Sequence, residues 1–111
     1  SYLAYYDSLT GLANRTLFID QATQALKNQS TSDSLIACYF FDIDNFKFIN
    51  ESLGHTKGDI LLQMVASRLK RVMSETHVVA RFGGDEYAIL KLGVANKSAA
   101  AEFAQKVLDI L

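Results

Sequence analysis

The sequence has no proline, a single cysteine and no surplus of charge of either sign. The lone Cys38 excludes a disulfide within the chain, which fits a reducing, cytoplasmic compartment. A formal net charge of −1 argues against a nucleic-acid polymer or an anionic membrane surface as the partner. No apolar run is long enough to span a bilayer, so we expect no membrane contact from this segment. A membrane anchor elsewhere in a parent protein stays compatible with this.

Half of the 111 residues are hydrophobic, enough for one globular domain over residues 1–111. Periodicity and turn residues predict a helix after the cap residue Asn14, a strand over 35–41, a helix from Thr56, a hairpin around 78–90 and a helix from Ser98. Residues 45–53 are predicted as a short helix or a wound loop, and 29–33 and 93–97 as loops. We expect Thr56 to form a capping box with Asp59. The side chains expected to face inward from the helices include Phe18, Leu26, Leu62, Leu69, Met73, Phe103, Leu108 and Leu111.

The run 35–41 is apolar without alternation, which predicts a central strand that is covered on both faces and contains a buried Cys38. The predicted order of elements is helix, strand, helix, strand, strand, helix. Such an order usually continues into one more strand, and the final helix has no stop signal. We therefore expect this chain to be a C-terminally incomplete piece of a longer domain.

The most informative stretch is 78–90, where two apolar runs flank two glycines and then the adjacent acids Asp85 and Glu86. Alone, this pattern predicts only a hairpin with a solvated turn. A strand–helix–strand crossover, however, makes strands 35–41 and 78–82 parallel, so that their C-terminal ends meet at one edge of the sheet. The topology therefore brings Asp42, at the end of the first strand, close to Asp85 and Glu86.

Three carboxylates at one edge repel one another unless a cation lies between them. An all-oxygen donor set without a histidine or cysteine cluster favours Mg²⁺ or Mn²⁺ over zinc. Two such ions, roughly 4 Å apart, can clamp the attacking and departing oxygens of a phosphoryl transfer. The simpler interpretation of Asp42 is an acid that caps the following turn, and its predicted neighbours favour metal binding.

The segment 45–59 begins at the same edge and carries groups suited to a nucleotide. Its first backbone amides and Lys47 could hold phosphate oxygens, although an ordinary solvated lysine explains Lys47 equally well. Asn50 offers an amide, and the Asp59 carboxylate can accept two hydrogen bonds from the N–H/NH₂ edge of guanine. Helix capping is the alternative for Asp59. We interpret His55 as a helix-entry residue rather than a general base.

Four blocks of the sequence occur together, at residues 7–15, 41–50, 54–59 and 81–87. In this order they resemble the GGDEF domain, the catalytic domain of diguanylate cyclases. Any one block would be weak, but the set spans nearly the whole chain. The resemblance implies an α+β fold, the ferredoxin-like nucleotidyl-cyclase palm, with an antiparallel central sheet, flanking helices and a last strand that this chain does not reach.

The resemblance also implies a reaction in bacterial signalling. Two GTP condense to cyclic di-GMP and release two pyrophosphates, with Mg²⁺ or Mn²⁺ as cofactor and two ions per site. Each domain would hold one GTP, and a homodimer is needed so that each ribose 3′-oxygen attacks the α-phosphate on the opposite domain. Sensor or phosphodiesterase domains are expected in the parent protein.

The resemblance assigns roles to individual residues. The implied metal ligands are Asp42, the carbonyl of Ile43, and Asp85. Either Glu86 or Asp85 takes or orients the proton of the 3′-hydroxyl, and Lys47 steadies phosphate charge. The implied substrate-binding residues are Phe46, Asn50, His55, Asp59, Gly83 and Gly84, of which Asn50 and Asp59 read guanine.

The chain departs from the family at three places. Tyr87 stands where the signature has phenylalanine, and its hydroxyl needs a partner if it is buried. Residues Ser74 to His77 stand where product-inhibited members carry Arg-x-x-Asp, so we expect no feedback inhibition through this surface. The later basic residues that grip the terminal phosphates in the family would lie beyond Leu111.

Two other functions stay open. A non-catalytic GTP-binding regulatory module, controlling a tandem phosphodiesterase domain, is the main alternative. Asp42, Lys47, Asp85 and Glu86 argue against it, because a regulatory domain does not need all four. A template-dependent polymerase palm shares the two-metal logic, but the chain has no basic surplus for a nucleic-acid strand.

Overall fold

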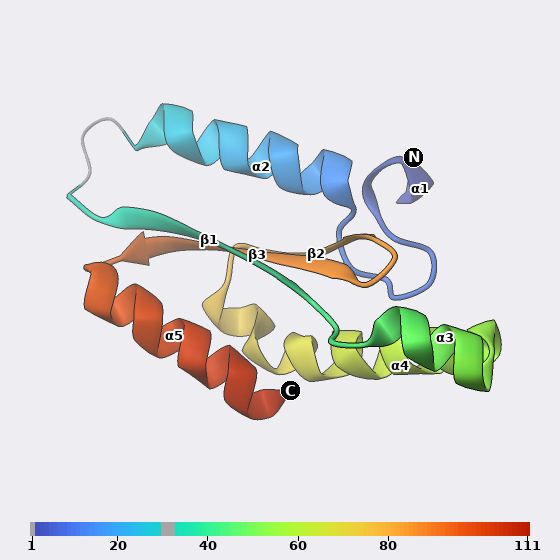
Figure 1. Ribbon diagram of the computed structural model, residues 1–111. Coiled ribbons are helices and arrows are strands. Elements are labelled where there is room, and N and C mark those ends of the chain that lie inside the picture. The colour runs from blue at the N-terminus through green and yellow to red at the C-terminus, as the bar shows by residue number, and fades with distance from the viewer. Residues whose placement is uncertain (1, 30–32) are drawn as a thin grey trace.

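The computed structural model describes residues 2–29 and 33–111, so most of the polar loop expected at 29–33 lies outside the described residues. The elements are α1 (Tyr2–Tyr5), α2 (Arg15–Asn28), β1 (Leu35–Asp42), α3 (Phe46–Leu53), α4 (His55–Leu69), the 3₁₀ helix η1 (Lys70–Glu75), β2 (Val78–Gly83), β3 (Glu86–Val94) and α5 (Lys97–Ile110). The described strands form one antiparallel sheet in the order β1-β3-β2. Helix α2 covers one face of it, and α4 and α5 cover the other (Figure 1). The predicted α+β architecture is confirmed.

The core has two parts, one on each face of the sheet. Alternate residues of a strand point to opposite faces, and β3 supplies both parts. Tyr87 and Ile89 pack with residues of α4 and α5, whereas Ala88 and Leu90 pack with Phe18 of α2. Strand β3 is therefore the buried central strand.

The prediction that the run 35–41 is the central strand, with a buried cysteine, was wrong. Within the described residues β1 pairs only with β3 and forms an edge of the sheet. Cys38 is exposed, and Phe40 keeps 64% of its surface accessible. The apolar run shows that a strand forms, but its place in the sheet depends on partners that are distant in sequence.

One helix cap matches the prediction from the sequence, and two differ from it. Asn14 caps α2 as predicted, because its side chain accepts a hydrogen bond from the Leu17 amide. Helix α4 begins at His55 after Gly54, without a capping side chain, so the predicted box of Thr56 and Asp59 was wrong. The last helix is capped by Asn96 rather than Ser98, since β3 continues to Val94 and leaves a shorter loop.

Several apolar residues at the margins of the helices face solvent instead of the core. The exposed fractions are 63% for Leu26, 42% for Met73, 62% for Leu108 and 37% for Leu111, which corrects the inward positions expected for them. Each lies at the border of an apolar stripe, where periodicity cannot separate the last covered position from the first uncovered one. No helix among the described residues is long and apolar enough to cross a membrane.

Candidate active site at the hairpin edge of the sheet

Strands β1 and β2 end at the same edge of the sheet, with β3 between them. Both are antiparallel to β3, so they run in the same direction, as the crossover argument predicted. Asp42 lies directly opposite Glu86 in the register of β1 and β3. Facing residues in an antiparallel pair have Cα atoms about 4.5–5.5 Å apart. The carboxylates of Asp42 and Glu86 therefore share one small region of the sheet edge.

A cavity of about 270 Å³ opens at this edge, and both acids line it together with Phe40, Phe82 and Tyr87. Like charges directly opposite each other on a sheet are destabilising, so a cation would relieve the pair. Asp85 is half-buried in the adjoining turn. In the described ranges, however, no group of three acidic, histidine or cysteine side chains lies close enough to hold a metal ion. The structure thus brings two of the three predicted acids into register.

The tip of the hairpin is built from two glycines and fastened by an arginine. Gly83 and Gly84 have φ angles of +121° and +50°, which side-chain-bearing residues rarely adopt. The Arg81 guanidinium donates to the Gly84 carbonyl from Nε at 3.0 Å and from Nη2 at 2.8 Å. Its Nη1 lies 2.9 Å from Oδ1 of Asp7, whose other oxygen accepts from the amide and hydroxyl of Thr10. The turn that holds the acids is thereby tied to the N-terminal turn.

The sequence predicts that Asp7 bonds to nearby backbone, which its bond from the Thr10 amide confirms, but it does not predict a pair with Arg81. They are 74 residues apart in sequence, and no local pattern predicts that they pair. A signal was present all the same. An arginine just before a tight hairpin turn, at a position where the strand is half-buried, needs an acidic partner.

The segment after β1 turns sharply into α3. Asn45 has a φ of +61°, and the Ile43 carbonyl accepts a hydrogen bond from the Phe46 amide at 3.3 Å. The Lys47 side chain is 90% exposed and lies 3.9 Å from Glu51, one helical turn away. Lys47 is thus a solvated lysine in this structure, and its phosphate role stays a prediction.

The junction of α3 and α4 contains an unusual polar group. The Oδ1 atom of Asn50 is buried and has no hydrogen-bond partner in the part of the chain that the structure describes. It packs against Gly58, where an added Cβ would collide with it, and the Phe46 ring lies on the same spot. His55 and Asp59 are exposed at the start of α4. A buried acceptor without a donor is costly, so this carboxamide is an unusual feature of the junction.

The buried hydroxyl of Tyr87 has the hydrogen-bond partner that it needs. The hydroxyl donates to the Leu62 carbonyl at 2.7 Å, and the ring stacks on Phe41 with centroids 5.6 Å apart. Burial raises the pKa of Tyr87 to about 12, so the phenol is neutral at physiological pH. The tyrosine is thus accommodated where the family signature has phenylalanine.

Comparison with known proteins gives consistent matches. The family model "Diguanylate cyclase, GGDEF domain" matches residues 4–111. The diguanylate cyclase TpbB of Pseudomonas aeruginosa is 38% identical over 108 residues, covering 97% of this chain and 25% of that protein. The cyclic di-GMP phosphodiesterase NbdA of Pseudomonas aeruginosa is 49% identical over 88 residues, covering 79% of this chain and 11% of that protein. The chain thus spans a quarter or less of these relatives.

The structural matches agree. The coiled coil and GGDEF domain of DgcB from Caulobacter crescentus, in complex with c-di-GMP, superposes with a TM-score of 0.86 and 32% identity, covering 96% of this chain and 55% of that one. The GGDEF domain of TpbB (YfiN) from Pseudomonas aeruginosa gives a TM-score of 0.84 and 35% identity, covering 96% and 62%. With its antiparallel palm and its acid-bearing hairpin, this chain belongs to the GGDEF domain family of diguanylate cyclases.

Proposed function

We propose that this domain condenses two GTP into cyclic di-GMP with release of two pyrophosphates. The observation that carries the proposal is the pairing of Asp42 with Glu86 at a cavity on the sheet edge, beside Asp85. Two carboxylates directly opposite each other on a sheet repel, and a bound cation would relieve this repulsion. The family and the relatives named diguanylate cyclase supply the substrate.

The donor set fits Mg²⁺ or Mn²⁺, in the proposed number of two ions. Asp42, the Ile43 carbonyl and Asp85 would hold the metal, and all three offer the hard oxygen atoms that these ions prefer. The Ile43 carbonyl accepts one hydrogen bond and keeps a second lone pair. When bound, the ions would neutralise charge that develops on the phosphate oxygens.

The chain's own residues bind and orient the substrate. The Asn50 carboxamide, whose Oδ1 has no partner among the described residues, contacts guanine, and Asp59 accepts from the N–H/NH₂ edge of the same base. Phe46 and His55 border this region at the ends of α3 and α4. Guanine selection therefore belongs to the α3–α4 junction.

The phosphates belong to the hairpin tip. Positions Gly83 and Gly84 face open space, so phosphate oxygens can approach their backbone closely. Lys47 extends from the exposed side of α3 and steadies phosphate charge. Glu86, or Asp85 in its place, accepts or orients the proton of the 3′-hydroxyl.

One domain supplies half of the reaction. The 3′-oxygen of one GTP must reach the α-phosphate of another, so the proposal requires a homodimer in which two hairpin edges face each other. Asp42 and Glu86 are exposed, which leaves this edge accessible to a second copy. We place the domain in the cytoplasm, where GTP is available, joined to sensor or phosphodiesterase domains of a parent protein.

The test is turnover of GTP by the protein in the presence of Mg²⁺, with product separated by chromatography. We expect cyclic di-GMP, formed at a rate per chain that rises with protein concentration. Asp85→Asn should lower the rate about a hundredfold or more, since loss of a metal ligand removes several kcal/mol of transition-state stabilisation. Asp109→Asn, a change at an exposed helical acid on α5, should leave the rate unchanged. Undiminished turnover by a folded Asp85→Asn protein would remove Asp85 from the metal site.

A second candidate function is favoured by the 49% identity to a protein named a cyclic di-GMP phosphodiesterase. In that case the domain binds GTP without turnover and controls a tandem phosphodiesterase domain. The same assay separates the two functions. Saturable GTP binding without product, in a preparation shown to be dimeric, would favour the regulator.

A further inference from the structure

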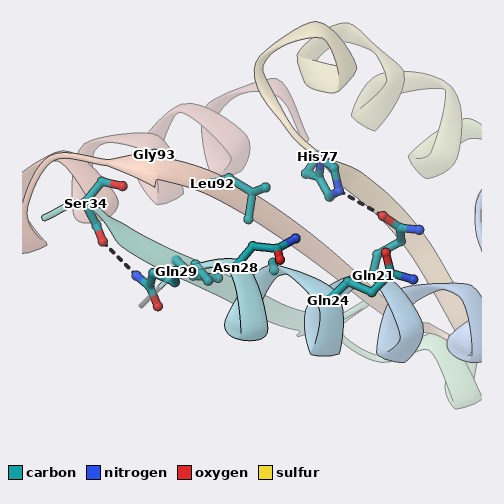
Figure 2. Close-up of a pocket in the computed structure, with 10 residues that line it drawn as sticks. Gln21, Gln24, Asn28, Gln29, Ser34, His77, Leu92 and Gly93 are labelled. Carbon is teal, nitrogen blue, oxygen red and sulfur yellow. Dashed lines mark hydrogen bonds between the residues drawn. The ribbon is translucent and has the colours of Figure 1, made fainter. Parts of the chain in front are cut away.

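A second cavity, of about 320 Å³, lies at the opposite end of the sheet from the acid pair. Figure 2 shows it between the C-terminal half of α2 and the end of the sheet where β3 terminates. Its polar lining residues are Gln21, Gln24, Asn28, Gln29, Ser34 and His77. None of the roles proposed above uses these side chains.

The described residues that line this cavity include no Asp, Glu, Lys or Arg. A phosphate or carboxylate ligand would therefore find no counter-charge, and a metal ion would find no carboxylate. Apart from His77, the polar side chains are carboxamides and a hydroxyl, which remain neutral at every physiological pH. The cavity is suited to an uncharged ligand that forms hydrogen bonds.

Two hydrogen bonds fix the ends of the cavity and leave its middle open. Gln29 donates to the Ser34 carbonyl at 2.7 Å, and His77 Nε2 lies 3.0 Å from Oε1 of Gln21. Asn28 lies between these two pairs, whereas the Gln24 side chain, one helical turn away, extends toward Gln21 (Figure 2). Asn28 and Gln24 are the groups available to a ligand.

These two carboxamides keep hydrogen-bonding capacity. Gln24 donates to Asp20 at 3.1 Å, and its Oε1 accepts no hydrogen bond from the described residues. The Asn28 carboxamide has no partner within residues 2–29 and 33–111. Ala25, Ile36 and Leu92 add an apolar surface beside them. The site thus combines donor–acceptor pairs with a surface for a flat ring.

We propose that this cavity binds the adenine ring of an uncharged ligand such as a nucleoside. A carboxamide carries a donor and an acceptor side by side, and Asn or Gln pairs in this way with the N6 and N7 atoms of adenine. Guanine presents two acceptors at the same edge, so it cannot pair with both atoms of the carboxamide. The volume lies at the small end of ligand pockets, about 300–1,000 Å³, which suits a single base.

The test is titration of the protein with adenosine, followed by the side-chain amide signals in ¹H–¹⁵N spectra and by calorimetry. Inosine is the matched ligand, because it carries an oxygen in place of the exocyclic amine and a proton on N1, while N7 and the ribose are unchanged. We expect saturable binding of adenosine that shifts the Asn28 signals, and binding of inosine weaker by roughly tenfold. This comparison uses the wild-type protein and does not depend on any variant folding.

Variants then locate the site. Asn28→Leu should weaken adenosine binding roughly tenfold. Gln105→Leu is the control, because it removes a carboxamide from an exposed helix face outside the cavity. Gln105 bonds to Asp109 in the same way as Gln24 bonds to Asp20. Saturating GTP should not displace adenosine, because the guanine site lies at the other end of the sheet. Absence of saturable adenosine binding, equal binding of inosine, an unchanged affinity in Asn28→Leu, or displacement by GTP would each overturn the proposal.

Discussion

Tyr87 shows how one hydroxyl makes the core depend on pH. The phenol is buried against α4 and has a pKa of about 12, compared with 10.0 for an ordinary tyrosine. The unfolded chain therefore loses this proton at lower pH than the folded one. The stabilising contribution is complete below pH 10.0 and is lost as the pH rises toward about 12.

Tyr87→Phe tests this contribution. We expect the variant to be less stable by about 1 kcal/mol at neutral pH, because the hydrogen bond to Leu62 is lost while the ring stays packed. The difference in unfolding free energy between the variant and wild type should shrink above pH 10.0, because the tyrosine of the unfolded wild-type chain then loses its proton and wild-type stability falls. Urea unfolding across the alkaline range measures both effects. A constant difference at all pH values would show that Tyr87 does not titrate as described.

We expect Asn50 to contribute to GTP binding and not to the stability of the fold. Its buried Oδ1 has no partner among the described residues, so its removal should cost the fold little. We predict that Asn50→Ala leaves the unfolding free energy unchanged or raises it, while GTP affinity falls by about tenfold or more. Ser52→Ala, at an exposed position of the same helix, should change neither quantity. Calorimetric titration with GTP and thermal unfolding decide between these outcomes, and GTP affinity equal to wild type would remove Asn50 from the guanine site.

At the scale of elements, one arginine joins two segments from opposite ends of the chain. Arg81 on β2 binds the tip of the hairpin and the turn that precedes α2. The side chains of Arg81 and Asp7 are only 12% and 16% exposed, so solvent screens this ion pair weakly. The position of the hairpin acids therefore depends on the N-terminal turn.

Arg81→Ala should destabilise the protein by about 2 kcal/mol, since it removes charged hydrogen bonds from a half-buried site. It should also lower GTP turnover more than the stability loss explains, because the turn with Asp85 is released. Lys47→Ala offers a comparison on stability alone, since that ion pair is exposed and should contribute less than about 1 kcal/mol. Thermal unfolding and turnover at a temperature where both variants are folded are the measurements. Equal stability of the two variants would contradict a stabilising role of the Arg81–Asp7 ion pair.

The order and type of the longer elements could be predicted because each rests on a local signal, whereas the 3₁₀ helix η1 was not distinguished from the end of α4. The glycines fixed the hairpin, and the handedness of crossovers placed the ends of β1 and β2 together, which the register of Asp42 and Glu86 confirms. The caps were less predictable, because Ser98 competes with the nearby Asn96 for the same role. Neighbouring polar residues with similar capping ability cannot be ranked without the length of the preceding strand.

At the scale of the whole molecule, what failed was the prediction of burial at the sheet edge. Cys38 and Phe40 belong to an apolar strand, yet they are exposed because β1 is an edge among the described strands. The pairing of Asp7 with Arg81 was not predicted for a related reason, since a contact between distant segments produces no periodic pattern in the sequence. The candidate site could therefore be located from the predicted topology and the family resemblance, whereas the contacts that support it could be identified only in the structure.

We propose that the edge carrying Asp42, Asp85 and Glu86 binds a divalent ion together with GTP. The most direct measurement is paramagnetic broadening of ¹H–¹⁵N signals when Mn²⁺ is added with a non-hydrolysable GTP analogue. We predict selective loss of signals from residues 42–43 and 85–86, and its absence in Asp42→Asn. Asp109→Asn should behave as wild type. Broadening centred elsewhere, or identical broadening in the wild-type and Asp42→Asn proteins, would contradict the account.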